Sequence, residues 1–220
     1  AGELRWRHAQ GATTRGNVSG HSFDEYVRGI EALEGAPVDA YEVNISCRNV
    51  DAGGMTIGTC AASVEDVVGR CRAATKRPLI VKLTPNVTDV TEIARAAEAA
   101  GADAVSLINT LLGMAIDVER RRPVLARGVG GFSGPAVKPV ALRMVWECSK
   151  AVKVPLLGMG GISNATDAVE FMLAGATSVA VGTANFVNPF ATVEIIDGVA
   201  QYCEQHGVDD VQDLIGALEW

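Results

Sequence analysis

The 220-residue sequence has few cysteines, little basic charge and no long apolar run. Its cysteines are odd in number and never adopt the C-x-x-C spacing of zinc or redox pairs, so we expect no metal site and a reducing, cytoplasmic setting. No run approaches the ~18 to 20 apolar residues of a membrane span, and the first thirty residues lack the apolar core of a signal peptide. A net charge of −7 without a basic stripe argues against a nucleic-acid surface.

What the sequence does contain is a large share of apolar residues, 48% against 20% charged, which is enough to bury the core of one domain. Short apolar runs alternate with helical patterns. Runs that are apolar on both faces are typical of parallel strands covered by helices. The predicted strands lie in residues 41–46, 78–84, 103–109, 154–160 and 177–183, and residues 13–20 could contribute a sixth.

Capping signals separate the predicted helices from these strands. Three helix starts carry a capping box and a fourth carries a capping Asn, while a glycine follows several helix ends. The phrases AAGADAVSLIN and LAGATSVAVGT repeat one helix–glycine–strand unit, which indicates a repeated βα architecture. The predicted starts are the boxes Ser22–Glu25, Ser63–Asp66 and Asp89–Glu92 and the cap Asn164, and the terminating glycines are Gly35, Gly101 and Gly175.

Two architectures fit this alternation, the doubly wound sheet and the TIM (β/α)8 barrel. A doubly wound nucleotide binder carries G-x-G-x-x-G after its first strand, whereas GMGGIS at 158–163 lacks the third glycine and lies late in the chain. In a barrel, the loops after the last two strands form a phosphate site, and GMGGI and VGTANF are both glycine-rich. The sequence therefore favours an α/β fold of the barrel class.

Five or six strands fall short of the eight that close such a barrel. We expect the first two or three strand–helix units to be missing from the N-terminal side. Residues 1–16 show no clean periodicity and are predicted to be an irregular, non-matching stretch, whereas residues 17–220 form the C-terminal portion of a single barrel domain.

Polar residues follow the predicted strands at their carboxyl ends, where barrel active sites lie. A cysteine there more often packs than reacts, but the carboxamides beside Cys47 need partners that a planar heterocycle would supply. Lys82, inside LIVKLT, needs an anion or an electron-rich cofactor atom. Gly160-Gly161 and Gly182-Thr183 could simply be turns, but they could also present backbone N–H groups to a phosphate. Residues 130–135 are predicted to be a long loop, compatible with a lid or a cofactor contact.

These motifs resemble one known family. The phrases NISCRN, IVKLTPNVTD, SLINTLLGMAID, GGFSGPAVKPVALRMVWE, GMGGISNATDAVEFMLAGA and VAVGTANFVNPFA together look like dihydroorotate dehydrogenase, and INTLLGMAID points to the class 1B catalytic subunit. The resemblance runs from about Gly16 to about Tyr202. It implies a (β/α)8 barrel with FMN over its mouth that oxidises dihydroorotate to orotate in pyrimidine biosynthesis.

Site roles follow from the same resemblance, position by position. Cys47 would be the base that removes the C5 proton of dihydroorotate while a hydride leaves C6 for the flavin. The residues implied to bind the pyrimidine are Asn44, Asn49, Asn109 and Thr110. Those implied to bind FMN are Asn17, Asn44, Lys82, Ile108, Gly134, Gly160, Gly161, Gly182 and Thr183.

The resemblance also implies partners, which are an electron-transfer subunit carrying FAD and a 2Fe-2S cluster with NAD as acceptor, and a homodimer within a heterotetramer. Arg48 departs from the family, which usually has Pro after the catalytic cysteine. Two alternatives remain open. One is a related flavin barrel that reduces another pyrimidine, of the dihydropyrimidine or dihydrouridine type. The other is an inactive barrel fragment.

Overall fold

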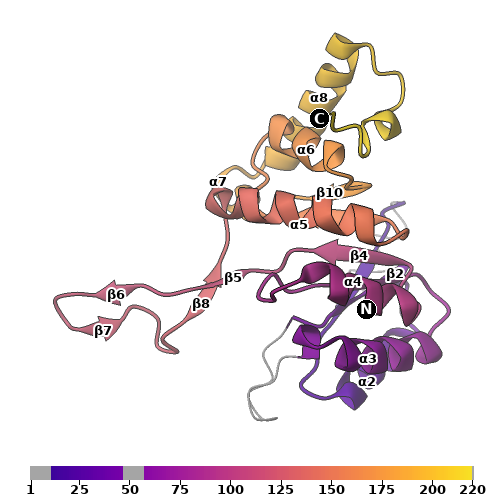
Figure 1. Ribbon diagram of the computed structural model, residues 1–220, viewed down its shortest axis with the longest axis vertical. Coiled ribbons are helices and arrows are strands. Elements are labelled where there is room, and N and C mark those ends of the chain that lie inside the picture. Colours follow the sequence, from indigo (N-terminus) through magenta and orange to yellow (C-terminus); the bar gives the residue numbers. More distant parts are fainter. Residues whose placement is uncertain (1–10, 47–56, 220) are drawn as a thin grey trace.

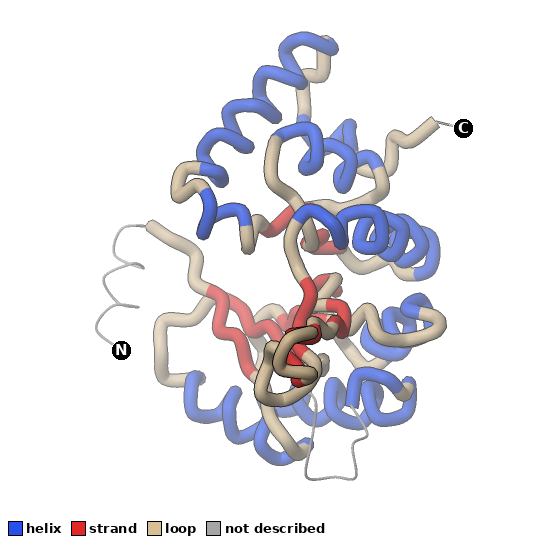
Figure 2. The backbone as a smooth tube through the Cα atoms, turned by 90° about the vertical axis from the view of Figure 1, so that its left-hand side faces the viewer, coloured by secondary structure: helices blue, strands red, loops and turns tan. Residues whose placement is uncertain are grey.

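A single sheet of six parallel strands organises the protein, whose computed structural model describes residues 11–46 and 57–219. The sheet curls as a half-barrel with helices around its outer face (Figures 1 and 2), which confirms the predicted incomplete (β/α)8 barrel. All six expected strands are present, each shorter than the run that predicted it. In sheet order they are β1 (Arg15–Val18), β2 (Ala40–Asn44), β3 (Leu79–Lys82), β4 (Ala104–Leu107), β9 (Leu156–Met159) and β10 (Ser178–Ala180).

Helices alternate with the strands, and successive ones pack side by side, α2 on α3, α3 on α4 and α4 on α5. None of the described helices is long and apolar enough to cross a membrane. The α-helices are α2 (Phe23–Leu33), α3 (Ala61–Ala74), α4 (Val90–Ala99), α5 (Lys138–Ala151), α6 (Ala165–Leu173), α7 (Ala184–Val187) and α8 (Ala191–His206). Short 3-10 turns are η1 (Ile57–Thr59), η2 (Pro135–Val137) and η3 (Val211–Leu214).

Three of the four predicted helix caps are confirmed. The side chains of Ser22, Asp89 and Asn164 each accept a hydrogen bond from a backbone N–H in the first turn of the helix that follows. The prediction that Ser63 opens a helix is wrong, because α3 begins two residues earlier and Cys60 is its N-cap. Alanine is the strongest helix former, so Ala61 and Ala62 extend the helix in front of the expected cap.

The two faces of the sheet differ in polarity. Tyr41, Val43 and Val81 are fully buried with the side chains of the helices that cover the outer face. Residues that alternate with them, such as Asn44 and Lys82, lie on the concave face, and the parallel register places these two opposite each other. The polar side chains of neighbouring strands are therefore gathered inside the curve of the sheet.

An arm between β4 and α5 extends away from the half-barrel (Figure 1). It consists of two short antiparallel pairs, β5 (Leu111–Gly113) with β8 (Gly130–Phe132) and β6 (Ile116–Asp117) with β7 (Arg122–Pro123). The expectation that residues 130–135 form a loop is therefore wrong for 130–132. These residues carry two glycines and no apolar alternation, so only their pairing with β5 reveals the strand.

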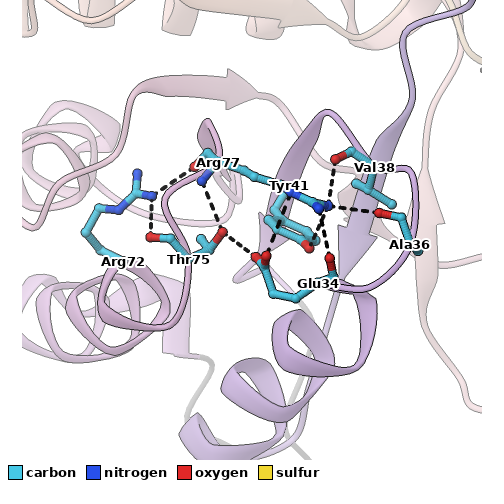
Figure 3. Close-up of polar contacts among 7 residues, drawn as sticks. All are labelled: Glu34, Ala36, Val38, Tyr41, Arg72, Thr75 and Arg77. Atoms are coloured by element: carbon cyan, nitrogen blue, oxygen red, sulfur yellow. Dashed lines mark hydrogen bonds and ion pairs between the residues drawn. The ribbon is translucent and has the colours of Figure 1, made fainter.

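At the amino ends of the strands, Arg77 joins the end of α2 to the start of β3 (Figure 3). Its guanidinium donates hydrogen bonds to the backbone carbonyls of Glu34 (2.8 Å), Ala36 (3.1 Å) and Val38 (2.7 Å). The same group lies 5.9 Å from the centroid of the Tyr41 ring. Because the last carbonyls of a helix lack partners within it, one side chain here satisfies both a helix end and the loop that follows.

Candidate functional site

A cavity of about 350 Å³ opens at the carboxyl ends of the strands. It is bounded by the ends of β3, β4, β9 and β10, by the turn before η2 and by α7. Most residues predicted for the site line this one cavity, although they come from five separate parts of the chain. They are Lys82, Ile108, Asn109, Thr110, Gly134, Gly160, Gly161, Gly182 and Thr183.

Two asparagines meet at the edge of this cavity. The Asn109 carboxamide donates a hydrogen bond of 3.2 Å to Oδ1 of Asn44 and also contacts the hydroxyl of Ser46. The Asn109 carbonyl oxygen accepts the backbone N–H of Thr110 at 2.8 Å. The predicted pyrimidine-binding residues Asn44, Asn109 and Thr110 thus form one hydrogen-bonded group that joins the ends of β2 and β4.

Asn17 lies on β1 opposite Glu42 of β2, which is two residues before Asn44 on the same strand. Its amide donates to Oε2 of Glu42 at 2.7 Å, and the Ser106 hydroxyl donates to Oε1 of the same carboxylate at 2.7 Å. Glu42 is 4% exposed. Sequence reasoning passed over Glu42, although a carboxylate inside the apolar run YEVNIS was a signal that could have found it.

The glycine turns require glycine. Gly160 and Gly161 have φ angles of +127° and +82°, and a Cβ at Gly161 would lie 2.9 Å from the Gly134 carbonyl oxygen and from the Lys138 nitrogen. Within the described residues, the backbone N–H groups of Gly161, Ile162 and Thr183 have no protein acceptor. All three residues line the cavity, so its wall presents unpaired donors.

Behind these turns lies an ion-pair cluster that sequence reasoning also passed over. Lys138 Nζ contacts Asp167 Oδ1 at 2.7 Å and Glu170 Oε2 at 2.8 Å. The backbone N–H and the hydroxyl of Ser163 both donate to Asp167 Oδ2 at 2.8 Å. Burial alone would raise the pKa of Asp167, but the hydrogen bonds from Lys138 and Ser163 outweigh it and hold that pKa below its usual value.

The predicted residues Cys47 and Asn49, together with Arg48, lie outside the described residues. The chain on each side of that segment is held by hydrogen bonds. The Tyr26 hydroxyl donates to the carbonyl of Asn44 at 2.9 Å, and the backbone N–H of Gly58 donates to the carbonyl of Ile45 at 3.0 Å. A Cβ on Gly58 would lie 2.7 Å from that carbonyl oxygen. Only glycine therefore fits where the chain comes back into contact with Ile45.

A curled parallel sheet with outer helices and a cavity at its carboxyl ends defines a protein of the (β/α)8-barrel class, in which small-molecule sites lie at the barrel mouth. A sequence model of the family "Dihydroorotate dehydrogenase" matches residues 3–202. The chain belongs to the dihydroorotate dehydrogenase family.

Relatives with similar sequences support this assignment to the family. The chain is 60% identical over 204 residues to the "Dihydroorotate dehydrogenase B (NAD(+)), catalytic subunit" of Trichlorobacter lovleyi and 58% identical over 204 residues to that of Bacteroides thetaiotaomicron. Each match covers 92% of this chain and 67% of the relative.

A solved structure shares the fold. It is the crystal structure of DHODH in complex with ferulenol from Eimeria tenella, with a TM-score of 0.74 at 24% identity. The likeness covers 89% of this chain and 57% of that one, so the chain spans little more than half the length of the solved protein.

Proposed function

We propose that this protein catalyses the FMN-dependent oxidation of dihydroorotate to orotate. The donor set of the cavity fits FMN. The unpaired N–H groups of Gly161, Ile162 and Thr183 suit a phosphate, and Lys82 suits an electron-rich edge of a flavin ring. The residues assigned to hold the cofactor are the FMN set expected from the sequence, from Asn17 at the base of the site to Thr183 at its phosphate end.

Substrate binding is assigned to the carboxamides. Asn44, Asn109 and Thr110 offer both donors and acceptors, as the alternating N–H and C=O groups of a pyrimidine require, and their mutual hydrogen bonds fix their orientation. We assign Asn49 to the same group from its place in the sequence motif.

The chemistry needs a base for the C5 proton of dihydroorotate, and we assign that role to Cys47. A thiol with an ordinary pKa of about 8.5 is mostly protonated at neutral pH, so the site must favour its thiolate. The electron pair of the broken C5–H bond forms the C5–C6 double bond of orotate. Bound FMN supplies the acceptor for the hydride that leaves C6.

One observation carries this proposal. Residues from five separate parts of the chain, assigned to FMN and pyrimidine from the resemblance to the family, line a single cavity at the barrel mouth. Residues that merely ended strands in a structural barrel would have no reason to combine unpaired N–H donors, a lysine and paired carboxamides in one cavity.

Partners are proposed from the relatives' names. Those relatives are called catalytic subunits of an NAD(+) enzyme, so we infer a separate electron-transfer subunit, carrying FAD and a 2Fe-2S cluster, that passes electrons to NAD. A homodimer within a heterotetramer is the assembly proposed for the whole protein.

The test is the absorbance spectrum of the purified protein before and after anaerobic addition of dihydroorotate. Bleaching of the visible flavin band would support the proposal, since it reports hydride transfer. An oxidised spectrum that ignores dihydroorotate would contradict the substrate, and a colourless protein that takes up no added FMN would contradict the cofactor.

A second candidate has its own observation. Within the described residues, the outer edges of β1 and β10 pair with no strand, and Phe186, Val187 and Phe190 are 92%, 86% and 68% exposed. Open edges and exposed apolar side chains favour association over independent catalysis. The 220-residue chain by itself would then be an inactive barrel fragment, for which the expected result is a colourless protein that takes up no added FMN.

A further inference from the structure

Two turns form the wall of the cavity on the side of α5 and α6. One runs through Gly134 to η2, and the other is Gly160–Ser163, between β9 and α6. They touch through their backbones, because a Cβ on Gly161 would lie 2.9 Å from both the Gly134 carbonyl oxygen and the Lys138 nitrogen. A contact with no side chain between the two backbones leaves little room for either turn to shift.

Asp167 holds the second of these turns from behind. Its Oδ2 accepts both donors of Ser163 at 2.8 Å, and its own backbone N–H donates to the Asn164 side chain at 3.0 Å. The side chain is 8% exposed, and it is not among the residues that line the cavity. Asp167 therefore makes no direct contact with the cavity and acts on it from behind the wall.

Lys138 connects Asp167 to the first turn. It is the first residue of α5, directly after η2, and its Nζ lies 2.7 Å from Asp167 Oδ1. Without this cation, a buried carboxylate behind the cavity wall would oppose the binding of an anion in front of it. The ion pair thus removes an electrostatic penalty and ties the two turns together.

We propose that Asp167 is a positioning residue for the phosphate of the cofactor, since it sets the Gly160–Ser163 turn so that the N–H groups of Gly161 and Ile162 meet that phosphate. This inference rests on the proposed binding of FMN. It goes further by assigning a role to a residue that does not touch the ligand.

Glu170 provides the matched control. It contacts the same ammonium group, at 2.8 Å, and it lies one turn further along the same helix. Its side chain is 37% exposed, and it makes no hydrogen bond to Ser163 or to the turn. Loss of Glu170 therefore removes one carboxylate from Lys138 and leaves the turn held.

The experiment compares FMN with riboflavin, which is the same flavin without the phosphate. The 220-residue chain, freed of flavin, is titrated with FMN and with riboflavin, and binding is followed by quenching of flavin fluorescence. Asp167→Ala should weaken FMN at least ten-fold and riboflavin less than two-fold, so that the preference for FMN falls. Asp167→Asn, which keeps one acceptor for Ser163, should lie between Asp167→Ala and the wild type. Glu170→Gln should change both affinities less than two-fold.

Each other result overturns the inference. Equal binding of FMN by the wild type and both Asp167 variants would show that the turn does not need Asp167. A parallel loss of both flavins would show a merely structural role. If Asp167→Ala does not fold, Asp167→Asn decides by the same ratio. Equal affinity of the wild type for the two flavins would remove the phosphate subsite, whereas a wild type that binds neither flavin would remove the proposed function as well.

Discussion

The hydroxyl of Tyr26 donates a hydrogen bond of 2.9 Å to the backbone carbonyl of Asn44, across 18 residues of sequence. Tyr26 is fully buried on the inner side of α2, and Asn44 is the last residue of β2, where the chain leaves the sheet toward Cys47. This bond fixes the backbone of the residue whose carboxamide pairs with Asn109. A side chain in the core thus helps to place the substrate group proposed above.

Tyr26→Phe should remove this bond and keep the ring. We expect the free energy of unfolding to fall by about 1 kcal/mol, the net contribution of a typical hydrogen bond, measured by urea denaturation. Tyr202→Phe is the control, because Tyr202 is only half-buried and stacks on His206 through its ring, which phenylalanine retains. Equal stability of the Tyr26 variant and the wild type would show that the bond contributes nothing.

Arg77→Met tests the amino ends of the strands. The change keeps an apolar stem and removes the donors to the carbonyls of Glu34, Ala36 and Val38. Hydrogen bonds from charged groups are individually worth more than neutral ones, so we expect a loss of about 2 to 3 kcal/mol in urea denaturation. Lys76→Met changes an exposed neighbour and should cost less than about 0.5 kcal/mol. A comparable loss in the two variants would contradict this account.

The strands and three helix starts could be predicted because their signals are local. An apolar run of four to seven residues and a cap three residues from an acidic side chain are readable without tertiary contacts. The convergence of Lys82, Asn109 and Gly160 could also be predicted, since the carboxyl ends of parallel strands share one edge of the sheet.

Features that depend on distant pairing could not be read from the sequence. Leu111 pairs with Phe132, which lies 21 positions further along the sequence, and neither residue stands in a run with the pattern of a strand. The Ser106 hydroxyl donates a hydrogen bond to Glu42, 64 positions away in the sequence, and the Lys138 ammonium donates one to Asp167, 29 positions away. A charged residue alone predicts the need for a partner, but only the fold identifies that partner.

The thiols should differ in reactivity. Backbone hydrogen bonds from Ser63 and then Ala62 lower the pKa of the exposed Cys60, whereas burial raises the pKa of Cys71 and of Cys148 to about 12. Because the thiolate is the reactive form, iodoacetamide at neutral pH should modify Cys60 and spare the two buried thiols. Peptide mass spectrometry in native buffer and in urea measures this. Native labelling of Cys71 as fast as Cys60 would contradict the buried placement.

Acid should release the contribution of Asp167 to stability. Its pKa in the folded state lies below the unfolded value of about 3.9, so its stabilisation is present above that pH and is lost as the pH falls through the folded pKa. Lys138 has a raised pKa, because of hydrogen bonds to Asp167 and then Glu170, so its contribution persists until the pH rises past its ordinary range. The stability gap between wild type and Asp167→Asn should therefore be constant near pH 6 to 8 and shrink below about pH 4. A gap that stays constant down to pH 2 would argue against a titrating carboxylate.

Cys47→Ala tests the base assigned to the reaction. The substitution removes the proposed proton acceptor, while the cavity proposed to hold the flavin, lined by Lys82 and the glycine turns, keeps all its residues. A positioned base contributes about 10²- to 10⁴-fold to rate, so the rate of flavin bleaching by anaerobic dihydroorotate should fall by that factor, with FMN affinity unchanged within two-fold. Cys203→Ala, on α8, controls for the loss of a thiol elsewhere and should bleach at the wild-type rate. Cys47→Ser should also bleach slowly, at a rate that increases with pH, because a hydroxyl is harder to deprotonate than a thiol and little of it is in the basic form at neutral pH. Unchanged bleaching in Cys47→Ala would remove Cys47 from the reaction and leave the flavin site itself intact.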